Sequence, residues 1–224
     1  LNDAGYPYCL GKIMSSEVEF CRPLSAWCAA FEGWITAVEP KDLLRAKIFF
    51  DFRSALGEGE LVPALHNHLE QCLNQNPRFF PMLVQSILHY EPPLTSFGSF
   101  ALTEAEGGRQ GFDIKGAMAQ LVDVARLRAL QGGIRVAGTL DRLQALAEAG
   151  LVEQQNADES SKSFRLLLDL RLTHQATRRG NHLEVDNLID PEKLSPEKTK
   201  ETKQAFQQIK ALQQILQHEF GTNR

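Results

Sequence analysis

The chain has 224 residues, of which 43% are hydrophobic and 23% are charged, and its formal net charge is −4. These proportions are ordinary for a soluble globular protein and allow one large domain or two small ones. The acidic balance argues against a general nucleic-acid binder, which usually has a basic face. No apolar run approaches the roughly 20 residues that span a bilayer, and no signal peptide is recognisable, so we expect neither nucleic acid nor membrane as a partner.

The four cysteines show neither the paired spacing of a zinc site nor a regular disulfide framework. Free thiols are typical of a reducing compartment, so the expected location is the cytoplasm. The chain begins with Leu rather than Met, and "LNDAGYPYC" is typical of the interior of a domain. We therefore expect the sequence to be a fragment of a longer polypeptide.

Residues 1–56 predict mixed α/β structure. A helix is expected behind Ser25, because Trp27, Phe31 and Trp34 recur at helical spacing, and a short helical stretch follows at 41–46. A strand is expected over Lys47–Phe52, where Asp51 lies among three phenylalanines. A carboxylate in such surroundings costs free energy unless another group neutralises it. The glycine-bearing "LGEGE" that follows predicts a domain boundary.

Helical patterns dominate from residue 61 onward. Thr139 and Ser195 are expected to cap the fourth and the last of these helices, and two short extended pieces joined by Gly107-Gly108 are expected within 99–115. The predicted fold class is mainly α: a bundle of about six helices over 61–224, preceded by an incomplete α/β fragment over 1–56. The expected helices cover 61–76, 77–90, 115–130, 140–149, 158–179 and 196–220.

Two of these helices carry polar residues beside strongly apolar stripes. Asp123 and Arg126 are three residues apart, and Arg171, His174 and Gln175 share one helix face. One interpretation is structural: Asp123–Arg126 is an ion pair, and Arg171 and His174 hold down the polar loop at 181–195. The other interpretation is a polar pocket for an anionic ligand, since guanidinium matches phosphate or carboxylate and the imidazole and amide add directional hydrogen bonds.

Five blocks of sequence then resemble a known family when taken together and in order. They are "GYPYCLGKIMSSEVEFCRPLSAW", "IFFDFR", "DIKGAMAQLVDVARLRAL", "LLLDLRLTHQ" and "VDNLIDPEKLS". The resemblance is to the bacterial nucleotidyltransferases that are often fused to CBS and cyclic-nucleotide-binding domains. These are distant relations of the protein-PII uridylyltransferases in the polymerase-beta-like superfamily.

The resemblance implies that residues 1–56 are the end of a nucleotidyltransferase domain and that 61–224 form its helical substrate-binding domain. Family members carry a Gly-Ser element and an Asp-x-Asp pair upstream, and this sequence contains neither in that place. In the superfamily a third carboxylate on a later strand joins that pair around Mg²⁺. The resemblance gives this catalytic and metal-binding role to Asp51, whose alternative is a structural ion pair with Arg45 or Arg53.

The same resemblance favours a substrate-binding role for Asp123, Arg126, Arg171, His174 and Gln175. The implied partners are a nucleoside triphosphate and a protein or small-molecule acceptor, with a PII-like regulator as the family-level candidate. Because two of the three metal carboxylates are missing, we expect the isolated chain to be inactive. Two alternatives remain open: a non-catalytic regulatory module that binds a nucleotide in signal transduction, and a helical bundle whose polar network serves only packing and homodimerisation.

Overall fold

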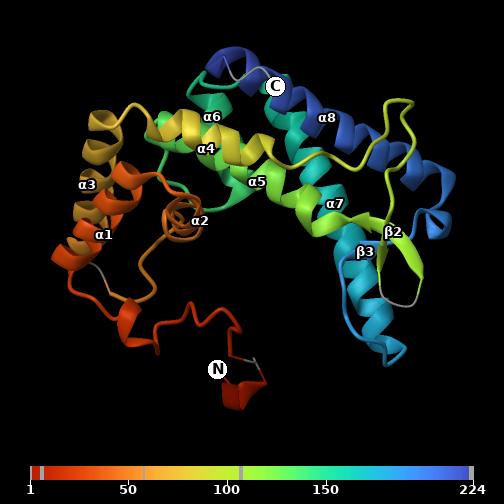
Figure 1. Ribbon diagram of the computed structural model, residues 1–224, viewed down its shortest axis with the longest axis horizontal. Coiled ribbons are helices and arrows are strands. Elements are labelled where there is room, and N and C mark those ends of the chain that lie inside the picture. The colour runs from red at the N-terminus through yellow and green to blue at the C-terminus, as the bar shows by residue number, and fades with distance from the viewer. Residues whose placement is uncertain (1, 6–7, 58, 106–107, 222–224) are drawn as a thin grey trace. The chain divides into compact units, whose positions relative to one another are not determined.

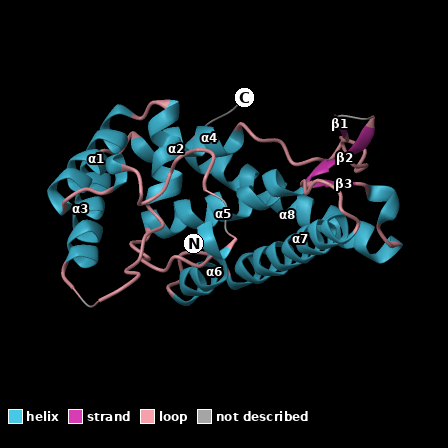
Figure 2. Cartoon of the chain, turned by 90° about the horizontal axis from the view of Figure 1, so that it is seen from below, coloured by secondary structure: helices cyan, strands magenta, loops and turns pink. Residues whose placement is uncertain are grey.

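The computed structural model describes residues 2–5, 8–57, 59–105 and 108–221 (Figure 1). It divides the chain into two compact units, Leu1–Pro77 and Arg78–Arg224, which we call the N-terminal and the C-terminal unit. The described residues form eight α-helices and one small three-stranded sheet (Figure 2). The prediction of a mainly α protein is therefore confirmed. None of the described helices is long and apolar enough to cross a membrane.

The N-terminal unit packs three α-helices around a cluster of aromatic rings. They are α1 (Leu24–Ala37), α2 (Pro40–Phe49) and α3 (Leu61–Gln75), preceded by the short 3-10 helices η1 (Asn2–Ala4) and η2 (Val18–Phe20). Pro23, not Ser25, is the N-cap of α1. The expected aromatic face of α1 is confirmed, because Phe31 and Trp34 are buried. Phe31 contacts the ring of Phe50, and Trp34 contacts the ring of Phe49 at the end of α2.

The strand expected over Lys47–Phe52 is wrong. Residues up to Phe49 belong to α2, and Leu43, Ala46 and Phe50 are buried at the spacing of one helix face. The alternation of Ile48, Phe50 and Phe52 is also typical of a strand, because a short apolar run fits both the two-residue period of a strand and the roughly 3.6-residue period of a helix. Within 1–56 the described residues contain helices and loops but no strand, so the α/β character expected for this segment is absent from them.

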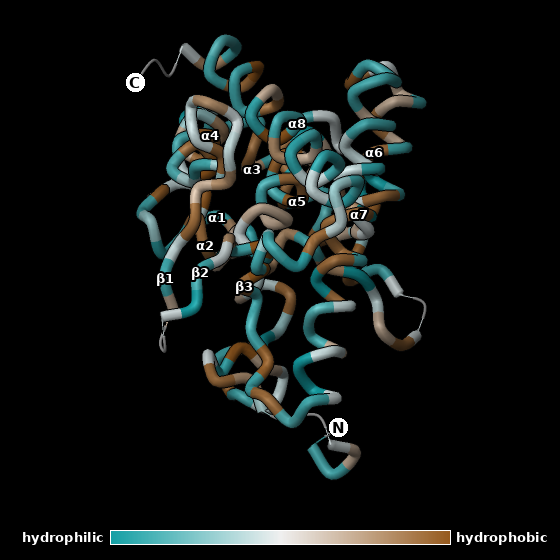
Figure 3. Tube along the Cα trace, turned by 90° about the vertical axis from the view of Figure 1, so that its right-hand side faces the viewer, coloured by the Kyte–Doolittle hydropathy of each residue, from teal (hydrophilic) through white to brown (hydrophobic). Residues whose placement is uncertain are grey.

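The C-terminal unit contains the other five helices, and their positions confirm the predicted ones. They are α4 (Phe79–Leu88), α5 (Ile114–Gln131), α6 (Thr139–Glu148), α7 (Gln154–Gly180) and α8 (Pro196–Phe220). Ser195 caps α8 as expected, since its hydroxyl accepts a hydrogen bond from the backbone N of Lys198 at 3.2 Å. At α6 the N-cap is Gly138 and Thr139 is the first helical residue. Helix α8 carries both hydrophilic and hydrophobic residues along its length (Figure 3), as an amphipathic helix does.

A small antiparallel sheet lies beside α7 in this unit. Its strands are β1 (Thr103–Ala105), β2 (Arg109–Asp113) and β3 (Leu188–Ile189), in the order β1-β2-β3. The first two are the extended pieces predicted within 99–115, while Gly107 of the expected turn lies outside the described residues. The third strand comes from the segment expected to be an irregular loop, and Phe112 pairs with Ile189 in its register.

The core of the C-terminal unit fills the space between the sheet, α5, α7 and α8. Phe112 of β2 meets Phe206 of α8 edge to face, with ring centroids 5.2 Å apart. Leu167 and Leu170 of α7 belong to the same buried cluster. The buried members of this cluster are Phe112, Ile114, Ala117, Met118, Leu121, Leu167, Leu170, Ile189, Ala205, Phe206 and Ile209. The core therefore fixes the sheet against the last three turns of α7, where the predicted polar residues lie.

Candidate functional site

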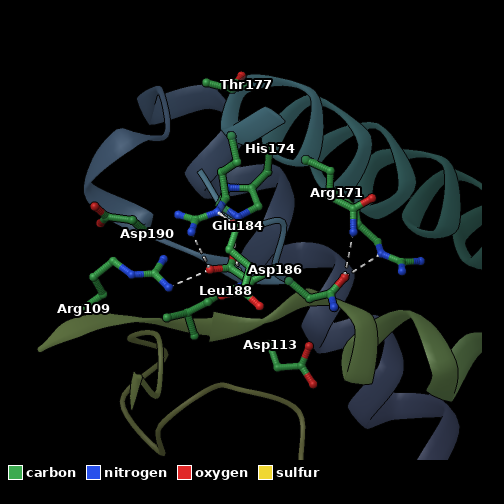
Figure 4. Close-up of polar contacts among 12 residues, drawn as sticks. Arg109, Asp113, Arg171, His174, Thr177, Glu184, Asp186, Leu188 and Asp190 are labelled. Atoms are coloured by element: carbon green, nitrogen blue, oxygen red, sulfur yellow. Dashed lines mark hydrogen bonds and ion pairs between the residues drawn. The ribbon is translucent and has the colours of Figure 1, made fainter. Parts of the chain in front are cut away.

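The polar face of α7 is a single row of side chains. His174 and Gln175 lie three and four residues after Arg171, and Arg178 lies four and three residues after them, so the four side chains project from the same side of the helix. The chain leaves α7 after Gly180 and returns along this face before entering β3 (Figure 4). The structure therefore brings together the three residues that the sequence placed on one face of this helix.

Asp186 is the centre of the cluster on the returning chain. Its Oδ1 lies 2.7 Å from Nε2 of His174 and accepts the backbone N–H of Leu188 at 3.2 Å. Its Oδ2 accepts a hydrogen bond from Arg109 at 2.7 Å and lies 3.3 Å from the guanidinium of Arg178. One carboxylate thus joins β2, α7 and β3 through four separate contacts (Figure 4).

These contacts decide the protonation state of Asp186. Burial by itself would raise the pKa of this carboxyl, but the hydrogen bonds from His174, Arg109 and the Leu188 amide, with the charge of Arg178, lower it to about 2. The carboxylate is therefore ionised at neutral pH and can only accept hydrogen bonds. It follows that Nε2 of His174 carries a hydrogen, which fixes how the imidazole is oriented.

Asn187 forms the second anchor of the returning chain. Its Oδ1 accepts from Nε of Arg171 at 2.8 Å and from Nε2 of Gln175 at 3.1 Å. Its backbone oxygen accepts the N–H of Ile114 at 3.0 Å, at the start of α5. Arg171 and His174 therefore contact the polar loop as the structural interpretation expected, and a binding role for the same residues stays a prediction.

The two Nη groups of Arg171 are not used by the cluster. Arg171 is half-buried and uses Nε for Asn187, but neither Nη1 nor Nη2 of Arg171 is hydrogen-bonded to any residue that the structure describes. Within the same described ranges Arg171 forms no ion pair, whereas Arg109 and Arg178 both contact Asp186. A guanidinium held by its Nε, with its two Nη groups directed outward, is suited to a forked contact with a phosphate or carboxylate.

Asp123 and Arg126 form a separate ion pair on α5. Their side chains are 2.6 Å apart and only 13% and 11% exposed, so the pair is nearly buried rather than a surface pair. Asp123 lies nine residues after Ile114, which is about 14 Å along a helix. Ala125, which precedes Arg126, packs with Leu143 and Ala157. Ala157 lies in the first turn of α7, whereas Arg171 lies in its last three turns. The structure therefore does not bring this pair into direct contact with the Arg171 cluster.

Asp51 lies in the N-terminal unit, in the bend that follows α2, and is half-buried. The argument that a rigid strand presents its carboxylate to a metal is wrong, because no strand is present there. Magnesium prefers several oxygen ligands, and the described residues contain no group of three or more His, Cys, Asp or Glu that could hold a metal ion. The described part of the chain thus does not fit a complete magnesium site, and a role for Asp51 as one ligand stays a prediction.

The sequence did not reveal the partners of the α7 face. Asp186, Asn187 and Arg178 lie in or beside the stretch interpreted as a polar loop, and Arg109 precedes Asp186 by 77 positions. A signal was nevertheless present, because an acidic residue and an amide stand side by side immediately before the apolar pair of β3. Short polar side chains at such a position often hydrogen-bond the backbone two residues on, as Asp186 does to Leu188.

The low pKa of Asp186 predicts a loss of stability in acid. A carboxyl with a folded pKa near 2 and an ordinary value of 3.8 stabilises the fold above pH 4 and loses this contribution as the pH falls toward 2. Because a quarter of the side chain is exposed, we expect about 1–2 kcal/mol rather than the full linkage value. Urea denaturation at pH 5 and at pH 2.5 measures the loss. The variant Asp186→Asn should show a smaller loss over that interval, and an equal loss would contradict the assignment.

Comparison with known proteins places the chain in a family. Residues 77–220 match the family model described as "Putative nucleotidyltransferase substrate binding domain", and residues 1–41 match the one described as "Putative nucleotidyltransferase DUF294". No curated protein and no solved structure matches the chain. The matched segment 77–220 contains α4 to α8, the sheet and the whole Asp186 cluster. Because this match covers well over half of the sequence, the chain belongs to the family of putative nucleotidyltransferase substrate binding domains.

Proposed function

We propose that the C-terminal unit binds the phosphate groups of a nucleotide at the Arg171 cluster, as the substrate-binding part of a nucleotidyltransferase. The observation that carries the proposal is the guanidinium of Arg171, held through Nε by Asn187 and directing its remaining donors away from the cluster. Phosphate oxygens accept such paired donors readily. The family description agrees with a substrate-binding role for the segment that contains this residue.

The neighbouring residues would then act by positioning. Gln175 shares the Asn187 oxygen with Arg171, so it restrains the same amide, and His174 holds Asp186 one residue earlier in the chain. A binding site on restrained side chains loses less conformational entropy when the ligand arrives. His174 and Gln175 therefore support Arg171 in this proposal, whereas the substrate-binding role expected for Asp123 and Arg126 stays a prediction.

The chemistry of a longer polypeptide that would contain this chain is a further part of the proposal. It would transfer a nucleotidyl group from a nucleoside triphosphate to a protein or small-molecule acceptor, with a PII-like regulator as one candidate acceptor. Mg²⁺ would neutralise the triphosphate and assist the departure of pyrophosphate. Asp51 would supply at most one carboxylate to that ion, and the other ligands would come from segments outside this sequence. We therefore expect no nucleotide transfer by these 224 residues alone.

Calorimetric titration of the 224-residue chain with each of the four ribonucleoside triphosphates tests the binding site. We expect at least one triphosphate to bind, and we expect Arg171→Ala to weaken its affinity about tenfold, because hydrogen bonds to charged groups contribute roughly 1.5–3 kcal/mol. Arg171→Lys should also bind more weakly, since lysine lacks the fork.

A matched control comes from the same helix. Arg165 is exposed on α7, and its replacement by alanine removes the same charge without touching the cluster. Arg165→Ala should leave the affinity within about twofold of the original value. If Arg165→Ala and Arg171→Ala weaken binding equally, the effect is one of net charge, and Arg171 does not form the site. Absence of binding by all four triphosphates would contradict the proposed function itself.

A further inference from the structure

A cavity lies within the C-terminal unit, at the end of α7 remote from Arg171. It has a volume of about 340 Å³, opens to solvent, and is lined by residues of α5, α6, α7 and α8 and of the loop that precedes α7. This volume falls in the range of small-molecule sites, which in helical bundles commonly lie between the helices. Its walls are mainly aliphatic, from Leu121, Val124, Ala125, Leu143, Leu146, Leu151, Val152, Leu212 and Ile215.

The polar groups of this cavity carry more negative than positive charge. Arg128 and Glu219 form an ion pair at 2.6 Å, so each neutralises the other. Glu153 is the N-cap residue of α7 and is exposed to solvent at the rim of the cavity; its side chain makes no capping hydrogen bond, and it forms no ion pair with any described residue. Asn156 also lines the cavity, and the Ser160 hydroxyl accepts a hydrogen bond from Gln208 at 3.2 Å. One carboxylate thus remains without a cationic partner within the described ranges.

We propose that this cavity binds a small molecule that has an apolar body and one protonated amine. The aliphatic walls would contact the apolar body, and the free energy of binding would become more favourable in proportion to the apolar area removed from water. The amine would pair with Glu153, while the Arg128–Glu219 pair would remain in place. An anionic head would instead meet the unpaired carboxylate of Glu153, so the site selects against acids and against phosphates. This ligand class differs from the one proposed for the Arg171 cluster, and either site can exist without the other.

Three probes of similar size test the selectivity: 3-phenylpropylamine, 3-phenylpropanol and 3-phenylpropionate. In calorimetric titrations of the 224-residue chain, we expect the amine to bind most tightly and the carboxylate most weakly. Glu153→Gln should weaken the amine about fivefold, which corresponds to the upper range for an exposed ion pair, and should leave the alcohol unchanged. Equal or tighter binding of the carboxylate would overturn the proposal, as would an amine affinity that does not respond to Glu153→Gln.

The location is tested separately by methyl NMR on the unsubstituted chain. The methyl signals of Leu143 and Leu146 should shift on titration with the amine, because both side chains line the cavity. The methyl signals of Leu83, a buried residue of α4 that does not line it, should stay unchanged. If Leu143 and Leu146 do not respond while the amine binds, the ligand sits elsewhere and the assignment of this cavity is wrong. Val152→Trp, which fills the cavity, should abolish binding of both the amine and the alcohol.

Discussion

Replacing Phe206 with alanine is expected to lower the free energy of unfolding of the C-terminal unit by about 3–5 kcal/mol. Phe206 is fully buried, and its ring meets Phe112 of β2 at 5.2 Å and Phe100 at 6.0 Å between centroids. Truncation therefore removes both the transfer free energy of a large ring and two aromatic contacts, and it leaves a cavity beneath the sheet. Urea denaturation followed by circular dichroism measures the change.

The control for this substitution is Phe97→Ala. Phe97 is 97% exposed, so the same truncation there removes almost no buried surface and should change stability by less than about 0.5 kcal/mol. A loss below about 1 kcal/mol for Phe206→Ala would mean that the sheet and α8 are not packed as described. The loop that carries Asp186 would then lack its support, because β3 contacts the same core through Ile189.

The helices of the C-terminal unit could be predicted because each shows a long apolar stripe and a terminal signal. In α8, Phe206, Ile209 and Leu216 recur at helical spacing behind the Ser195 cap, and the structure buries all three. The segment around Asp51 offered only four apolar residues within the six of Lys47–Phe52. A run of that length fits a helix and a strand equally, and burial of Leu43, Ala46 and Phe50 decided for the helix.

The candidate site was predictable on one side only. The spacing of Arg171, His174 and Gln175 follows from helix geometry, so the sequence could place them on one face. Their partners are set by tertiary structure: Asn187 and Asp186 reach α7 because the chain reverses after Gly180, and Arg109 arrives on a separate strand. Such contacts leave no periodic signal, since they join segments whose separation in sequence is arbitrary.

Replacing Asp186 with alanine is expected to destabilise the C-terminal unit by about 2–3 kcal/mol. The substitution removes the acceptor shared by His174, Arg109, Arg178 and the Leu188 amide, and it leaves three basic groups facing one another. Asp186→Asn keeps an oxygen of similar shape and should lose about half as much. Urea denaturation at pH 7 measures both variants.

Asp158→Ala is the matched control, because Asp158 is an exposed carboxylate of α7 that accepts a hydrogen bond only from Gln154 among the described residues. It should change stability by less than about 0.5 kcal/mol.

The Asp186→Ala variant also separates the two roles of the cluster. Its unpaired cations should now bind inorganic phosphate, so phosphate should restore more stability than chloride does at equal ionic strength. A variant that is destabilised but indifferent to phosphate would show that these basic groups only hold the loop, and anion binding would then depend on Arg171 alone. A variant as stable as the original chain would contradict the central place of Asp186 in this part of the fold.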